Sequence, residues 1–69
     1  MKQFKCVFSI EYWDNIPKDP VEHIIYAKSV EELQRNALKV FVNDQIEDET
    51  GVLDNAVGVS LLSFYFLPV

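Results

Sequence analysis

The chain has 69 residues, of which 49% are hydrophobic and 13% aromatic, and its formal net charge is −5 at pH 7. This length allows one domain, residues 1–69, and the single cysteine rules out an internal disulfide, so we expect a homodimer to add stability. The acidic balance argues against bare nucleic acid and anionic membranes as partners, and it favours a protein with a basic surface.

Residues 4–13 alternate between apolar and mostly polar side chains, a period of two that predicts the first strand. The following segment, 14–20, contains two prolines and three Asx residues, which favour a loop. A weaker alternation over 21–28 predicts the second strand. The short connection makes it antiparallel to the first strand.

A helix is predicted to begin after Ser29, because Ser29 and Glu32 have the spacing of a capping box. Apolar residues then recur at steps of three and four over 30–42. Acidic residues near a helix C-terminus oppose the macrodipole, so we expect the helix to end near Asn43. A helix extending to Glu49, with Gly51 as the residue after the cap, is the alternative.

Residues 59–67 predict a third strand that is apolar on both faces, with no charged residue. Regular alternation places Leu61, Tyr65 and Leu67 on one face, and Leu62, Phe64 and Phe66 on the other. The order β-β-α-β and a right-handed crossover predict an α+β fold. We expect a three-stranded sheet in the order 2-1-3 with the helix packed on one face.

In this arrangement the third strand lies at an edge of the sheet and is apolar. An edge of this kind is ordinarily protected, and pairing with a second copy would remove it. The candidate self-association residues are Leu61, Phe64, Tyr65, Phe66 and Leu67. The sequence leaves open which sheet face is uncovered, and whether this strand serves dimerisation or a partner.

Two further segments are candidate partner-binding sites. Trp13 and Asp14 come where the first strand enters a loop, and tryptophan is enriched at binding hot spots. Glu47, Asp48 and Glu49 form an acidic run that suits a basic partner.

The residues that could carry chemistry are few. A small enzyme or ligand carrier would use Cys6 and His23, which lie on neighbouring predicted strands; a buried thiol and an ordinary sheet histidine are the simpler interpretation. The acidic residues lack EF-hand spacing, and the two glycines do not form a phosphate loop. We therefore expect a protein that is not an enzyme and holds no cofactor or metal.

The succession of a long hairpin, the Ser29-capped helix and a final apolar strand, in an acidic chain of this size, resembles small phage-encoded inhibitor and anti-defence proteins. Uracil-DNA glycosylase inhibitors and anti-CRISPR proteins are of this type. The resemblance is one of architecture and carries over no residue role. It implies an acidic, dimeric protein that occupies the nucleic-acid-binding surface of a host protein.

Residues 27–38 also resemble the strand-to-helix stretch of HicB-like antitoxins, although the glycine- and proline-containing segment that precedes this stretch in those proteins is lacking here. This second resemblance implies an antitoxin-like or regulatory binding module. From the residues and the first resemblance together, we expect a small protein-binding inhibitor. The absence of a signal-peptide pattern and the single Cys6 predict the cytoplasm, that of the host if the protein is phage-encoded.

Overall fold

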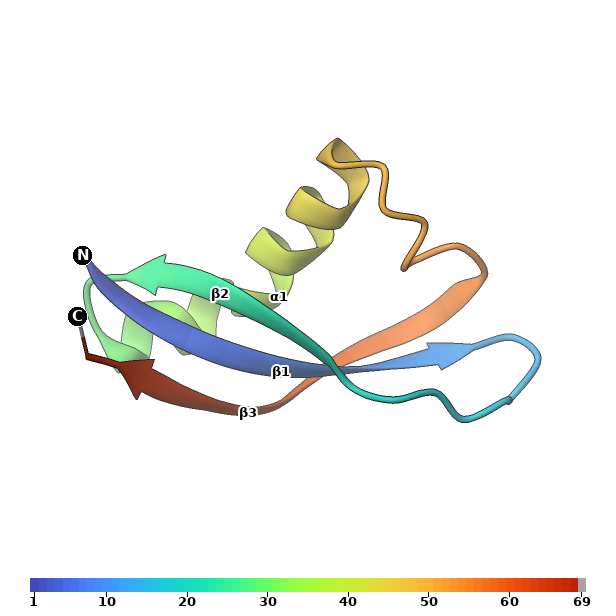
Figure 1. Ribbon diagram of the computed structural model, residues 1–69, viewed down its shortest axis with the longest axis horizontal. Coiled ribbons are helices and arrows are strands. Elements are labelled where there is room, and N and C mark those ends of the chain that lie inside the picture. Colours follow the sequence, from blue (N-terminus) through green and yellow to red (C-terminus); the bar gives the residue numbers. More distant parts are fainter. Residues whose placement is uncertain (69) are drawn as a thin grey trace.

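The computed structural model describes residues 1–68, which form three strands and one helix. The elements are β1 (Lys2–Tyr12), β2 (Val21–Ala27), α1 (Val30–Glu47) and β3 (Ala56–Leu67). The strands form one sheet in the order β2-β1-β3, and both outer strands run antiparallel to β1 (Figure 1). The predicted α+β class and strand order are therefore confirmed. The predicted strand ends differ from the observed ones by at most three residues, and β3 begins at Ala56 rather than residue 59.

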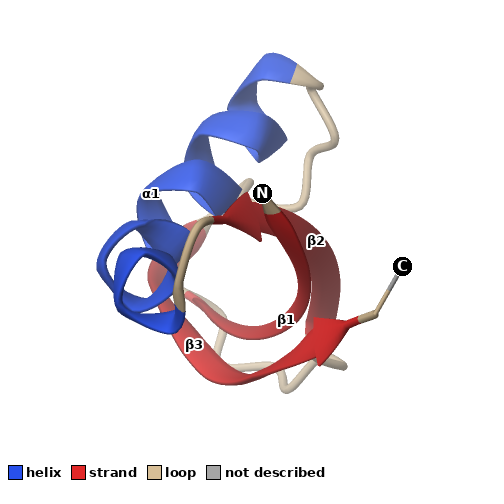
Figure 2. Ribbon diagram, turned by 90° about the vertical axis from the view of Figure 1, so that its left-hand side faces the viewer, coloured by secondary structure: helices blue, strands red, loops and turns tan. Residues whose placement is uncertain are grey.

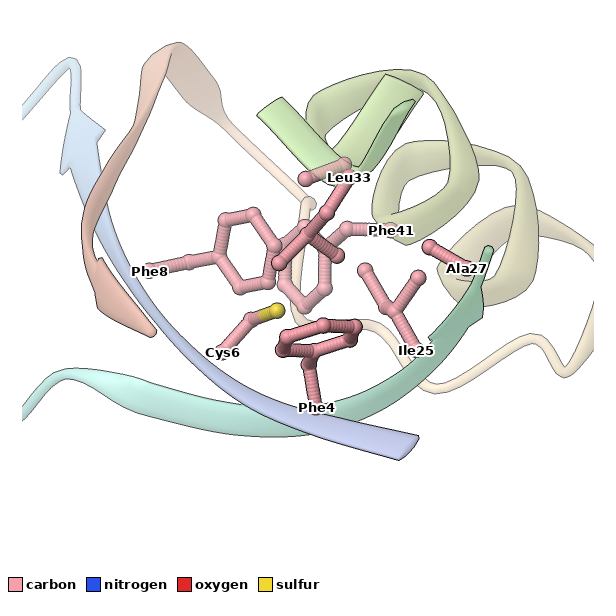
Figure 3. Packing of buried hydrophobic residues seen from close by; sticks show 8 residues of the cluster. Phe4, Cys6, Phe8, Ile25, Ala27, Leu33 and Phe41 are labelled. Carbon is pink, nitrogen blue, oxygen red and sulfur yellow. The ribbon is translucent and has the colours of Figure 1, made fainter. Parts of the chain in front are cut away.

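The core lies between the concave face of the coiled sheet and α1 (Figures 2 and 3). The rings of Phe8 on β1 and Phe41 on α1 stack with their centroids 4.1 Å apart. Burial of a side chain of this size contributes about 1.5–3 kcal/mol to stability. The buried cluster consists of Phe4, Cys6, Phe8, Ile25, Ala27, Leu33, Ala37 and Phe41.

The beginning of α1 agrees with the sequence prediction, but its end does not. The Ser29 side-chain oxygen accepts a hydrogen bond from the Glu32 amide at 3.2 Å, as expected of an N-cap. The prediction that the helix ends near Asn43 is wrong, because α1 continues for another turn to Glu47. The alternative extension to Glu49 is also wrong, since Glu49 itself has left the helix with a φ of 50°.

A Schellman motif explains how an acidic helix end is stabilised. The Glu49 amide donates to the Ile46 carbonyl at 3.2 Å, and the Thr50 amide donates to the Gln45 carbonyl at 3.3 Å. The Thr50 hydroxyl also donates to the Gln45 side-chain oxygen at 2.6 Å. These bonds satisfy carbonyls that would otherwise lack partners, and they outweigh the unfavourable carboxylate–dipole interaction.

Two register shifts interrupt the pairing of β3 with β1. Ser63 pairs with Val7 and Leu61 pairs with the next residue, Phe8, so Leu62 is left out as a bulge. A second shift leaves out Val57. A bulge changes which residues face the core. The predicted grouping of Leu61 with Tyr65 is therefore wrong.

Leu61 instead packs against the core, as Phe64 does. Ring–ring contacts with Phe4 place Phe66 on this same face, although half of the Phe66 side chain stays exposed. Tyr65 and Leu67 pair with Lys5 and Gln3 and lie on the opposite face of the sheet.

Candidate functional site

Trp13 lies directly after β1 and is 66% exposed. Its backbone amide donates to the Asn55 carbonyl at 3.1 Å, which ties the start of the loop to the segment before β3 while the indole side chain stays exposed. Asp14 is exposed, and its side-chain oxygen accepts from the Ile16 amide at 3.1 Å, which closes an Asx turn. The loop of residues 13–20, here named the Trp13 loop, thus exposes the Trp13 indole at its hydrogen-bonded start, residues 13–16.

Tyr12, the last residue of β1, anchors this end of the molecule. Its hydroxyl donates to the Val52 carbonyl at 2.6 Å, and the Lys18 ammonium lies 4.0 Å from the centre of its ring. An open hollow of about 420 Å³ lies between β1 and the Trp13 loop. Its lining consists of Ser9, Ile10, Glu11, Tyr12, Asn15, Ile16, Pro17 and Lys18.

Glu47, Asp48 and Glu49 are all exposed at the C-terminal end of α1. They belong to a segment, residues 44–55, that contains five acidic residues and no basic residue, here named the acidic segment. A second open hollow, of about 370 Å³, lies in this segment. It is lined by acidic Glu49 and Asp54 and by apolar Ile46 and Leu53, and Ile46 is 65% exposed.

The structure connects the two predicted partner-binding regions. The bonds from Tyr12 to Val52 and from Trp13 to Asn55 tie the end of β1 to the acidic segment. Both the Trp13 loop and the part of the chain that leads into β3 lie away from the chain termini, while the last turns of α1 rise from the sheet (Figure 1). No pattern in the sequence indicates this connection, because it depends on contacts between residues that are distant along the chain.

The predicted self-association residues on β3 divide into two sets. Leu61, Phe64 and Leu67 are partly buried, and the Phe64 ring contacts the Phe4 ring edge-on at 6.4 Å. Tyr65 and Phe66 are 49% and 51% exposed, on opposite faces of the strand. These two aromatic side chains are therefore the members of the set most available for contact.

The outer face of the sheet carries exposed apolar residues that the sequence analysis did not single out. Tyr26 and Ile24 of β2 are exposed there, and the Gln3 amide donates to the Tyr26 hydroxyl at 3.1 Å. Lys5 lies on β1, the central strand. Its Nζ atom forms an ion pair with a carboxylate oxygen of Glu22 on β2 at 2.8 Å. Hydrogen bonding and charge attraction from Glu22, together with Tyr65, raise the pKa of Lys5. In the sequence, the alternation of apolar and polar residues over 21–28 was the pattern that could have indicated this face.

Cys6 and His23 are direct partners in the β1–β2 register, as their neighbouring strands suggested. Cys6 is fully buried, and this burial raises the pKa of its thiol. The Nε2 atom of His23 lies 2.8 Å from an Asp44 carboxylate oxygen, and the His23 ring meets Phe41 edge-on. A nucleophilic cysteine needs a lowered pKa and access to solvent, and burial gives Cys6 the opposite properties.

Asp44 is the partner of His23 that the sequence analysis missed. It lies three residues after Phe41, so the helical period places it beside the buried stripe of α1. The resulting bond joins β2 to α1 at a partly buried position.

Within residues 1–68, no group of three or more His, Cys, Asp or Glu side chains is arranged to hold a metal ion. Among the same residues, no helix is both long enough and apolar enough to cross a membrane. No protein-family model, curated protein or solved structure matches this chain.

Proposed function

We propose that this chain is a protein-binding module that contacts a basic surface of another protein through its acidic segment and Trp13. The observation that carries the proposal is the pair of hydrogen bonds that fixes the end of β1 against residues 52–55. They join an exposed tryptophan to a segment with five acidic residues and no basic one. An exposed aromatic side chain whose backbone is bonded to the end of an acidic segment suits a partner of opposite charge.

Charge and composition support a protein as the partner rather than nucleic acid or a membrane. The chain carries a net charge of −5, which disfavours contact with phosphate groups. An acidic surface instead competes with nucleic acid for a basic protein site. The resemblance in size, acidity and element order to phage-encoded inhibitors favours a host protein whose working surface is blocked by occlusion. The single buried thiol fits a cytoplasmic setting for that encounter.

The first test compares two double variants that remove the same charge from opposite ends of α1. Glu47→Gln/Asp48→Asn removes two of the five negative charges of the acidic segment, whereas Glu31→Gln/Glu32→Gln removes the two negative charges of the first helical turn. A protein captured from cell extract on the immobilised wild-type chain is purified, and its affinity for each variant is measured at two salt concentrations. We expect about tenfold weaker binding for the first variant at low salt and little change for the second.

Trp13→Ala tests the aromatic part of the same surface. Because hot-spot truncations cost about 2 kcal/mol or more, we expect at least a tenfold loss of affinity with weak salt dependence. Ile16→Ala, in the same loop and also exposed, is the matched control. If the captured protein binds both Trp13→Ala and the Glu47/Asp48 variant with unchanged affinity, this surface is not its binding site and the proposal is wrong.

A further inference from the structure

β3 is an unprotected edge of the sheet. It pairs with β1 on one side, and within residues 1–68 no strand pairs with its other side. Natural edge strands usually carry charges that prevent pairing with other chains, yet none of the twelve residues of Ala56–Leu67 is charged. The opposite edge, β2, is shorter and carries Glu22 in its ion pair with Lys5.

The two bulges restrict which part of this edge can accept another strand. Bulges at Val57 and Leu62 disrupt the regular strand and increase its twist. Beyond Leu62, residues 63–67 keep an uninterrupted register against β1. This short segment contains Tyr65 and Phe66, the most exposed aromatic residues of the strand.

We propose that residues 63–67 pair in antiparallel orientation with the same segment of a second copy, with Tyr65 opposite the Tyr65 of that copy. A two-fold axis at Tyr65 places Phe64 of each chain opposite Phe66 of the other. Directly opposed aromatic residues stabilise antiparallel pairs. The two sheets then join into one sheet of six strands.

The distribution of charge favours a second copy as the occupant. β3 starts directly after the acidic segment, and the proposed pairing lies at the other end of the strand. The ten residues from Ala56 to Tyr65 make nine steps, which in a fully extended strand span at most about 30 Å. The two acidic segments therefore lie far apart in the dimer, well beyond a Debye length of about 8 Å at physiological salt. Two chains of charge −5 can therefore pair here without bringing their acidic segments together.

A five-residue pairing segment is short for an interface. It buries less than the roughly 800 Å² per partner of a standard protein–protein contact. We therefore expect a dimer that dissociates when diluted into the micromolar range.

The test is the mass in solution, measured by light scattering after size exclusion, over a range of concentrations. The wild-type chain is expected at twice its monomer mass at high concentration. Tyr65→Lys and Tyr65→Glu each place like charges directly opposite one another and should give monomers. An equimolar mixture of these two variants should regain the dimer mass, because unlike charges then face each other across the axis.

Val57→Lys is the matched control, since it adds a lysine to an exposed position of the same strand outside the paired segment. It should remain dimeric, and circular dichroism should show all variants folded. A wild-type chain that is monomeric at every concentration would overturn the proposal and leave this edge to an extended segment of another protein. A dimer that survives Tyr65→Lys, or that Val57→Lys disrupts, would also overturn it.

Discussion

Individual residues in this fold differ sharply in what their surroundings allow. Cys6 has no exposed surface, whereas Trp13, seven positions later, is mostly exposed on a loop whose backbone is fixed by hydrogen bonds. Both are single representatives of their residue type in the chain. Rarity therefore does not indicate function here, but accessibility separates a packing role from a surface available for contact.

Cys6 should resist alkylation in the native protein. Burial raises the pKa of its thiol above the ordinary value, so the neutral form is favoured in the fold. The neutral Cys6 thiol therefore makes its full contribution to the free energy of unfolding below the pKa of the unfolded state. This contribution is lost as the pH rises through the pKa of the folded state. We expect labelling by a thiol reagent at pH 8 to be at least about a hundredfold slower than in urea. Equal rates in both conditions would contradict the buried placement.

Glu49→Gly should stabilise the protein by about 1 kcal/mol. Glu49 has a φ of 50°, a left-handed conformation that costs a residue with a Cβ roughly 1–2 kcal/mol and costs glycine little. Urea unfolding measures the change in free energy. Glu49→Ala is the control, because it removes the same charge and keeps the Cβ. If both variants gain the same free energy of unfolding, the loss of the Glu49 charge, and not its backbone conformation, is responsible.

The elements show how two bulges redefine β3. A single extra residue at Leu62 turns Leu61 toward the core and leaves Leu62 more than half exposed. The same bulge that repositions these side chains also limits the length of regular strand edge. The core packing of β3 and the length of its regular edge thus depend on the same local feature.

Leu61→Ala should therefore cost more stability than Leu62→Ala. Removing a partly buried leucine side chain from the core costs about 2 kcal/mol or more, whereas a change at an exposed site usually stays within about 0.5 kcal/mol. Regular alternation from Phe64 would predict the reverse order. Urea denaturation of the two variants decides between the observed bulge and a regular strand.

Much of the fold follows from the sequence, since the alternation in β1, the Ser29 cap and the crossover rule define the elements and the strand order. The bulges could not be predicted, because a strand that is apolar on both faces hides a one-residue shift in its pattern. The end of α1 could not be predicted either. Glu49 occupies the left-handed position after the helix cap, where a glycine usually marks the end of a helix. Trp13 and the acidic residues were identifiable as exposed candidates. Their connection through Tyr12, Val52 and Asn55 depends on tertiary contacts.

The molecule as a whole combines a small core with an uneven distribution of charge. Its extents are 37 × 22 × 20 Å, and a chain of this size buries only about 60% of the surface that its unfolded form exposes. The acidic segment contains no basic residue, while the side of the termini carries both signs: Lys2 starts β1, Lys28 follows β2, and Glu31 and Glu32 lie in the first turn of α1. The proposed basic partner would bind at the acidic segment, and the proposed second copy would bind at the uncharged β3 edge.

The central position of β1 has a consequence for biosynthesis. β1 emerges from the ribosome before either neighbour, and β2 can close one of its edges as a local hairpin. Its other edge stays open until α1 and β3 have followed, because Phe4 pairs with Phe66 across almost the whole chain. Apolar side chains of β1 are exposed throughout this interval, and the nascent chain is open to wrong pairing. Formation of the β1–β3 ladder, with its large sequence separation, should be the slow step of folding, on a timescale of roughly milliseconds to seconds.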